Sequence, residues 1–131
     1  LMMSTDQVRS LKLRGMDVGG HTVTHPILKC LDDRQAEQEI ARGRDDLQQI
    51  AGGRVDLFAY PNGVPGVDYD ARHVAMARRC GFVGAVSTAR GVASHGADPF
   101  QLPRFTPWDR SASRYGLRMA GNLLRARHAV A

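Results

Sequence analysis

A chain of 131 residues is long enough for one domain with a modest core, and we expect no second domain of comparable size. Its hydrophobic share of 43% and charged share of 24% are those of an ordinary globular protein. No apolar run is long enough to span a bilayer, and the first residues lack the basic leader and apolar core of a signal peptide. We therefore expect no transmembrane segment.

The formal net charge of +5 comes from one end of the chain. From Arg104 onward there are six arginines and one acidic residue, whereas the preceding part carries 12 basic and 12 acidic residues. A nucleic-acid-binding face would interleave basic residues with aromatic ones, but this region has only Phe105, Trp108 and Tyr115. We therefore expect no nucleic-acid partner.

The first half of the chain predicts two helices and a strand between them. Ser4 is a helix cap with Gln7 in the reciprocal capping-box position, and Gly15 ends that helix. Residues 16–22 predict a short strand that ends at two glycines. The second helix is expected to begin at Asp32 or Asp33 and to end at residues 52–53, with a buried stripe formed by Ala36, Ile40, Leu47 and Ile50.

The next elements continue the alternation of strand and helix. Residues 55–60 predict a strand that Pro61, Asn62 and Gly63 end, residues 69–79 a helix that Gly81 ends, and residues 82–87 a further strand. Strands separated by helices of this length pair in parallel, so we predict an α/β fold with about three parallel strands and flanking helices. Three such units are fewer than a closed barrel needs.

The C-terminal part, residues 110–131, predicts a basic amphipathic helix that follows a domain at residues 1–109. Ser111 or Ser113 would cap it, and it would reach about His128. Its two faces are Arg110, Arg114, Arg118 and Arg125 on one side, and Tyr115, Met119, Leu123 and Ala126 on the other. One interpretation is a solvated face over a packed face. The other is a surface for anionic glycans, lipid headgroups or a partner protein.

The segment most indicative of chemistry is residues 21–26, His-Thr-Val-Thr-His-Pro. His21 and His25 are four apart, so on one helical turn both rings would reach the same ion. Pro26 prevents that turn from continuing as regular helix. The turn directly follows a predicted strand end, which is where α/β folds place ligands. Two capping or core histidines are the alternative, and the preceding glycines and following proline favour the site.

This segment resembles the second motif of the NodB-homology polysaccharide deacetylases, carbohydrate esterase family 4. The resemblance implies that His21 and His25 bind a divalent metal, usually zinc. Residues 58–63, Phe-Ala-Tyr-Pro-Asn-Gly, resemble the third motif, which lines the substrate groove and presents a backbone N–H to the oxyanion. That motif implies groove positions for Tyr60, Pro61, Asn62 and Gly63. Residues 102–105, Leu-Pro-Arg-Phe, resemble the conserved end of the bacterial exopolysaccharide branch and place Arg104 in the groove.

The likeness extends from about Met3 to Asp109 and implies the C-terminal part of a (β/α) deacetylase barrel. The implied reaction is removal of N-acetyl groups from a polysaccharide. A metal would lower the pKa of a water, and the metal and a backbone N–H near Asn62 would stabilise the oxyanion. The reaction also needs a base for the water and an acid for the leaving amine. Family relatives often act in the cell envelope or periplasm.

The chain departs from the family at the first motif, an Asp-Asp pair upstream of the histidines that supplies the base and the third metal ligand. The acids that precede His21, Asp6 and Asp17, do not resemble it. Ala59 also stands where the third motif usually has an arginine. The usual Leu-x-His acid is not evident, with His95 in a loop, and we expect His73 on the surface and His128 in the tail.

These departures predict a site with impaired activity. The alternative is a truncated, inactive remnant that serves as a glycan-binding or partner-binding module. An incomplete α/β unit exposes sheet edges and apolar faces, so we expect a homo-oligomer, most simply a dimer, in which another chain could supply a third ligand. Cys30 and Cys80 do not form a paired motif, and we expect them to be buried free thiols, with a disulfide as the alternative.

Overall fold

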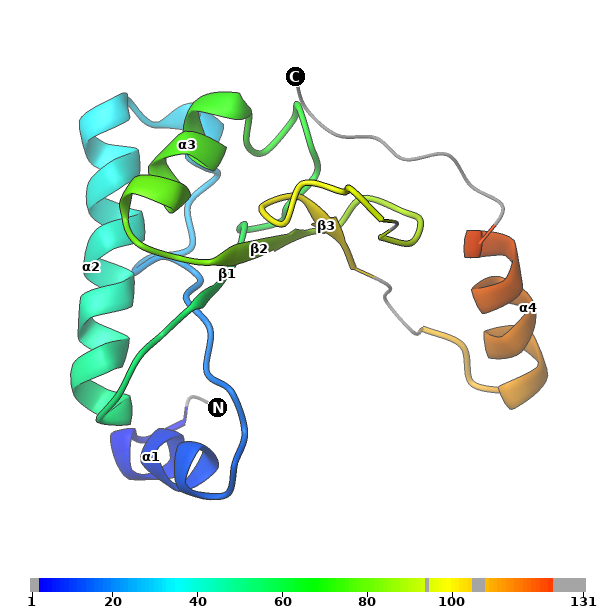
Figure 1. Ribbon diagram of the computed structural model, residues 1–131, viewed down its shortest axis with the longest axis horizontal. Coiled ribbons are helices and arrows are strands. Elements are labelled where there is room, and N and C mark those ends of the chain that lie inside the picture. Colours follow the sequence, from blue (N-terminus) through cyan, green and yellow to red (C-terminus); the bar gives the residue numbers. More distant parts are fainter. Residues whose placement is uncertain (1–2, 94, 105–107, 124–131) are drawn as a thin grey trace.

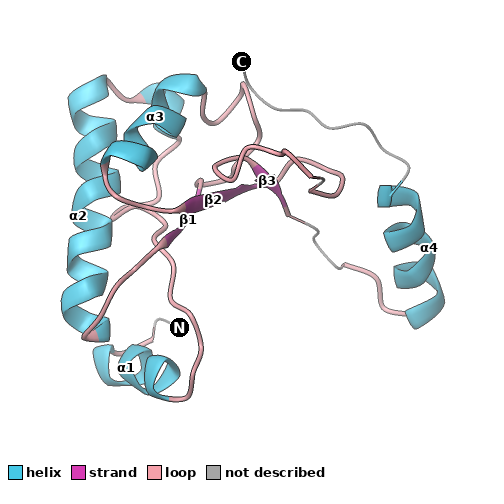
Figure 2. Cartoon of the chain, in the orientation of Figure 1, coloured by secondary structure: helices cyan, strands magenta, loops and turns pink. Residues whose placement is uncertain are grey.

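The computed structural model describes residues 3–93, 95–104 and 108–123 (Figure 1). Its elements in chain order are α1 (Thr5–Leu13), a 3-10 turn η1 (Leu28–Cys30), α2 (Asp33–Ala51), β1 (Leu57–Ala59), α3 (Ala71–Arg79), β2 (Gly84–Ser87), β3 (Leu102–Pro103) and α4 (Ala112–Leu123). Helices α1, α2 and α3 gather at one end of the molecule, and α4 stands apart from them beyond the sheet (Figure 2).

The three strands form one parallel sheet in the order β1-β2-β3. Phe58 of β1 pairs with Ala85 of β2, and Val86 of β2 pairs with Leu102 of β3. Gly20 forms a further parallel bridge with Phe58, so α2 and α3 each connect parallel neighbours. The predicted α/β fold with three parallel strands is confirmed.

One expected strand is wrong, and one strand of the sheet was not expected. The strand predicted at residues 16–22 is reduced to the single bridge at Gly20, because only this residue reaches the backbone of β1. The third strand of the sheet, β3, was not predicted. Pro103 lacks an N–H donor and disfavours a strand, but β3 lies at the edge of the sheet, where a proline is tolerated.

The ends of the helices follow their capping signals. Ser4 and Gln7 form the predicted capping box of α1. Asp32 caps α2, and Gly52 ends it in the left-handed conformation with φ 67°. The backbone of Gly81, just after α3, has φ 85°. The boundaries of these three helices were therefore predicted to within about two residues.

The core lies between α2, α3 and the sheet. Tyr60 and Tyr69 stack with ring centroids 3.8 Å apart, and Phe58 contacts both Tyr60 and Phe82 through its ring. The buried apolar side chains are Leu28, Ala36, Ile40, Val55, Phe58, Tyr60, Tyr69, Val74, Met76, Ala77, Phe82, Ala85 and Phe100. One continuous core thus supports the sheet from the helix side.

At residues 112–120, where the structure describes side-chain burial, helix α4 shows no packed face. Its side chains at residues 112–120 are all exposed, with Tyr115 at 41% and Leu117 at 75% of their full accessibility. Arg118 forms a two-pronged ion pair with Asp109, with N–O distances of 2.6 and 2.9 Å. The predicted continuation to Arg125, Ala126 and His128 lies outside the described residues. None of the described helices is long and apolar enough to cross a membrane.

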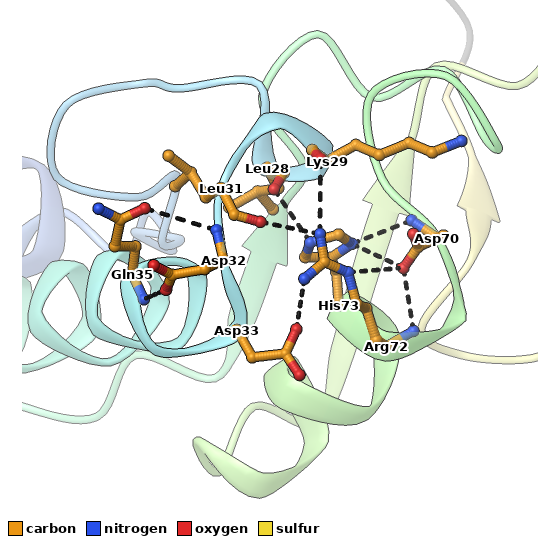
Figure 3. A network of polar contacts seen from close by, with 9 residues as sticks. All are labelled: Leu28, Lys29, Leu31, Asp32, Asp33, Gln35, Asp70, Arg72 and His73. Carbon is orange, nitrogen blue, oxygen red and sulfur yellow. Dashed lines mark hydrogen bonds and ion pairs between the residues drawn. The ribbon is translucent and has the colours of Figure 1, made fainter.

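His73 is buried, and the expectation that it lies on the surface is wrong. Its exposed fraction is 0%. The Nδ1 atom accepts the Asp70 N–H at 3.1 Å, and the Nε2–H donates to the Leu28 carbonyl at 3.1 Å (Figure 3). A histidine at the third position of a capping box turns back toward the start of its helix, and here that direction is the interior.

The neighbouring Arg72 strengthens the same junction. Its guanidinium forms an ion pair with Asp33 at the start of α2 and donates to the Leu31 carbonyl at 2.9 Å (Figure 3). Together His73 and Arg72 attach the segment around η1 to α3. Since η1 lies only a few residues beyond His25, this junction fixes the chain on the C-terminal side of the histidine motif.

The two cysteines are free thiols, as expected, but they are not both buried. Cys30 is exposed and Cys80 is half-buried. Burial raises the pKa of the Cys80 thiol, and the nearby Glu37 carboxylate raises it further.

We expect the buried His73 to make the stability of the fold sensitive to acid. Burial lowers the pKa of His73, and this effect exceeds the opposing influence of the Asp70 carboxylate. The unfolded chain therefore takes up the proton first, and the free energy of unfolding is expected to fall as pH drops through about 6.5 toward the folded-state pKa. Urea denaturation between pH 8 and 5 measures this slope.

The His73→Gln variant separates this histidine from other titrating groups. We expect its free energy of unfolding at pH 8 to be lower by about 1–3 kcal/mol, because buried hydrogen bonds are lost. Its slope between pH 8 and 5 should be flatter than that of the wild type. His95→Gln, at an exposed histidine, controls for the loss of one imidazole from the chain. An identical slope in the wild type and His73→Gln would show that His73 does not set it.

Candidate metal site

Gly20 places the histidine motif at the edge of the sheet. Its N–H donates to the Leu57 carbonyl at 2.8 Å, and its own carbonyl accepts the Ala59 N–H at 2.9 Å. A Cβ atom at Gly20 would lie 2.8 Å from Cζ of Phe82, so no side chain fits. His21 therefore emerges directly from this pairing, at the carboxyl end of the parallel strands.

The first histidine is held in one tautomer by the backbone. The Nδ1 atom of His21 lies 2.7 Å from the Ala59 carbonyl oxygen. A carbonyl can only accept, so Nδ1 carries the proton and the lone pair remains on Nε2. Metal-binding histidines are commonly oriented by a hydrogen bond of this kind, which leaves the other nitrogen free for the ion.

The second histidine lies beside the first. The ring centroids of His21 and His25 are 4.7 Å apart, in an edge-to-face arrangement. The predicted helical turn is wrong, however, because Thr22 and His25 both have left-handed backbones with φ 65° and 58°. The Thr22 hydroxyl donates to the His21 carbonyl at 2.5 Å and accepts the His25 N–H at 3.1 Å. A tight loop closed by Thr22 therefore brings the rings together.

These two imidazoles fit a divalent metal as a partial ligand set. Nitrogen ligands suit zinc, and catalytic zinc commonly has three protein ligands. Within the described part of the chain, no group of three or more His, Cys, Asp or Glu side chains could hold an ion. Asp6 and Asp17 instead form ion pairs with Arg9 and Lys12 of α1.

The segment after β1 places its members in different environments. The Tyr60 side chain is buried, and its hydroxyl donates to the Phe100 carbonyl at 3.0 Å. Burial raises the pKa of that hydroxyl. The Pro61 side chain is buried as well, so Tyr60 and Pro61 would reach a ligand through their backbone only. Asn62 is exposed with φ 55°, a conformation that asparagine tolerates.

Thr88, which the sequence did not single out, holds this segment. Its hydroxyl donates to the Asn62 carbonyl at 2.9 Å, and its N–H donates to the Gly63 carbonyl at 2.8 Å. Gly63 is buried with φ 79°, and an added Cβ would lie 3.0 Å from the Tyr60 carbonyl oxygen. No described residue accepts a hydrogen bond from the Asn62 N–H. A threonine directly after a predicted strand was the signal that could have identified Thr88.

The remaining groove candidate, Arg104, directly follows β3 and is exposed. Because the strands are parallel, His21, Asn62 and Arg104 all follow strand ends at the same edge of the sheet. Among the residues described, no hydrogen bond, ion pair or ring contact joins the histidine pair to Asn62 or Arg104. His95 lies in an exposed turn between β2 and β3, and Phe105 lies outside the described residues. The groove positions of residues 60–63 and Arg104 therefore stay predictions.

Comparison with protein families gives a match over residues 2–85, to the family described as polysaccharide deacetylase. A search of curated proteins gives no match.

Solved structures share the fold. The Streptococcus pyogenes deacetylase PplD in complex with acetate is 24% identical, with a TM-score of 0.78 over 88% of this chain and 50% of that one. IcaB from Ammonifex degensii is 23% identical, with a TM-score of 0.70 over 92% of this chain and 52% of that one. A family 4 carbohydrate esterase from Streptomyces lividans in complex with acetate is 24% identical, with a TM-score of 0.57 over 92% and 67%. The chain thus spans about half the length of the first two.

The close approach of the Phe82 ring to Gly20 can be tested by substitution. We expect Gly20→Ala to lower the free energy of unfolding by about 2 kcal/mol, because the new methyl group overlaps the Phe82 ring. Gly53→Ala is the matched control, since nothing lies within 4 Å of a Cβ at that exposed glycine. It should change stability by less than about 0.5 kcal/mol. Equal effects in urea denaturation would show that Gly20 is not sterically required.

Proposed function

Because this chain belongs to the polysaccharide deacetylase family, we propose that it binds a divalent metal, most simply zinc, as part of a site that removes N-acetyl groups from a polysaccharide. The observation that carries the proposal is the pairing of His21 and His25 at the carboxyl edge of the sheet, with the Nε2 lone pair of His21 left available. The α/β fold with three parallel strands is a partial deacetylase barrel, like those of the similar structures.

In this proposal the two histidines hold the ion, which would acidify a water and polarise the acetyl carbonyl. The Ala59 carbonyl keeps the His21 ring in the tautomer that binds metal. The Asn62 N–H is available to donate to the oxyanion. Thr88 binds the Asn62 carbonyl, which belongs to the next peptide unit, and so restrains the backbone directly after that N–H. The exposed Arg104 and the backbone of residues 60–63 would line the polysaccharide groove.

The residues described here include no third ligand and no base beside the histidine pair. A positioned general base contributes about 10²–10⁴-fold to the rate of such a reaction. We therefore expect this chain to turn over substrate about 10²–10⁴-fold more slowly than a site that has a third ligand and a general base. A glycan-binding module without hydrolysis is the alternative outcome.

We also propose that the chain forms a homodimer. Large apolar side chains are exposed on several elements, including Leu13 at 88%, Leu117 at 75% and Val67 at 64%. Apolar surface of this kind is usually covered by another chain. Light scattering after size exclusion is expected to give twice the 14.3 kDa mass of one chain. A mass of one chain at every concentration measured would contradict the proposal.

Metal binding is tested by zinc titration of metal-stripped protein in a calorimeter. We expect saturable binding in the wild type and a loss of affinity of at least about 100-fold in a His21→Ala, His25→Ala double variant, since both ligands are removed. A His95→Gln variant, which changes an exposed histidine outside the motif, is the control for nonspecific imidazole binding. It should keep the wild-type affinity. Equal zinc affinity in the wild type and the His21, His25 variant would overturn the metal site.

The same proteins then test the hydrolase part of the proposal. Acetate release from N-acetylglucosamine oligomers is expected to require zinc and to disappear in the His21, His25 double variant. Zinc binding in the wild type without any zinc-dependent acetate release would overturn the hydrolase assignment and favour the glycan-binding alternative.

A further inference from the structure

Helix α2 contacts the histidine loop through the carboxylate of Glu39. The Oε2 atom accepts the Val23 N–H and the Thr24 N–H, both at 2.9 Å. The Oε1 atom accepts the Thr24 hydroxyl, also at 2.9 Å. Three donors from two successive loop residues therefore converge on one side chain of a helix that lies some 15 residues further along the chain.

Gly43 on the same face of α2 makes a second contact with this loop. It lies four residues after Glu39, one helical turn away, and it is buried. A Cβ atom at Gly43 would lie 2.9 Å from the carbonyl carbon of Thr22. The loop backbone thus rests directly on the backbone of α2 at Thr22, while Glu39 holds the next two residues.

The contacts from Glu39 are made to the two loop residues that lie between two left-handed backbone positions. Val23 and Thr24 lie between Thr22 and His25, which both have left-handed backbones although neither is glycine. Such conformations persist only where the surroundings fix them from several directions. The bonds from Glu39 fix the two residues between them, and they touch neither imidazole ring.

The Glu39 carboxylate is kept ionised. Its partial burial would raise its pKa, but the hydrogen bonds from Thr24 and Val23 and the nearby Arg42 guanidinium together lower it below the usual value. A charged acceptor binds N–H donors more strongly than a neutral one. Val23, Thr24, Glu39 and Arg42 also line a surface groove of about 300 Å³, so these groups lie at the boundary with solvent.

We propose that Glu39 is a positioning residue for the metal site: it fixes the loop backbone so that the His21 and His25 rings meet. The part of this inference that concerns metal affinity rests on the function proposed above. We assign Glu39 no role as a ligand, because both of its carboxylate oxygens accept hydrogen bonds from Val23 and Thr24, and it belongs to no group of three possible ligands among the described residues.

Three variants test this role. Glu39→Ala removes all three bonds. Glu39→Gln keeps the shape and an acceptor oxygen but removes the charge. Glu37→Ala is the matched control, because Glu37 is a carboxylate on the same helix that pairs with Arg79 and not with the loop. Amide hydrogen exchange at Val23 and Thr24 reports the loop without metal, and zinc titration reports the ligand geometry.

We expect Glu39→Ala to lose protection at the Val23 and Thr24 amides and to bind zinc about 10–100-fold more weakly than the wild type. Glu39→Gln should have amide protection and zinc affinity between those of Glu39→Ala and the wild type. Glu37→Ala should keep the wild-type protection of the Val23 and Thr24 amides and the wild-type zinc affinity. This should hold even if its melting temperature drops as much as that of Glu39→Ala. This pattern separates positioning of the ligands from a general loss of stability.

Wild-type zinc affinity in Glu39→Ala would overturn the proposal while leaving the metal site intact. If the wild type itself binds no zinc, the proposed function fails, and amide exchange alone decides the role of Glu39. In that case unchanged protection of Val23 and Thr24 overturns the proposal, and lost protection upholds it for the loop. If Glu39→Ala does not fold, the comparison of Glu39→Gln with Glu37→Gln decides by the same two readouts.

Discussion

The backbone pairing between Gly20 and β1 is the constraint on which the candidate site depends. Two hydrogen bonds, from Gly20 to Leu57 and from Ala59 to Gly20, add the segment before His21 to the parallel sheet. The ring of Phe82 occupies the space that a side chain at Gly20 would need. The same strand end then supplies the Ala59 carbonyl that orients the His21 ring. One short pairing therefore sets both the position and the tautomer of the first histidine.

The loop that follows is held by three separate parts of the fold. Gly20 fixes its beginning, Glu39 and Gly43 of α2 support its middle, and His73 of α3 holds the segment beyond its end through the Leu28 carbonyl. A loop attached to three rigid elements would hold the two histidines in place for the ion that we propose, which would lower the entropic cost of binding it. This arrangement accounts for a left-handed backbone at Thr22 and His25 without glycine at either position.

The fold of the deacetylase family is present over a chain that spans half the length of PplD and 52% of IcaB. The described part supplies a histidine pair and the segments after β1 and β3, all at one edge of the sheet. Helix α4 differs from the rest in having only exposed side chains at residues 112–120, with its single described ion pair directed to Asp109. These residues of α4 therefore add nothing to the buried core.

The sequence by itself determined the features that local chemistry controls. Capping residues and glycines located the ends of α1, α2 and α3, the alternation of elements gave parallel strands, and the His-x-x-x-His-Pro segment gave the family and the histidine pair. Tertiary structure alone decided where side chains point. It turned His73 and Tyr60 inward, reduced residues 16–22 to one bridge at Gly20, and replaced a helical turn at the histidines with a loop held by Glu39. The reason is that caps and periodicity depend on residues within about a helical turn of each other, whereas burial and loop conformation depend on contacts between distant segments.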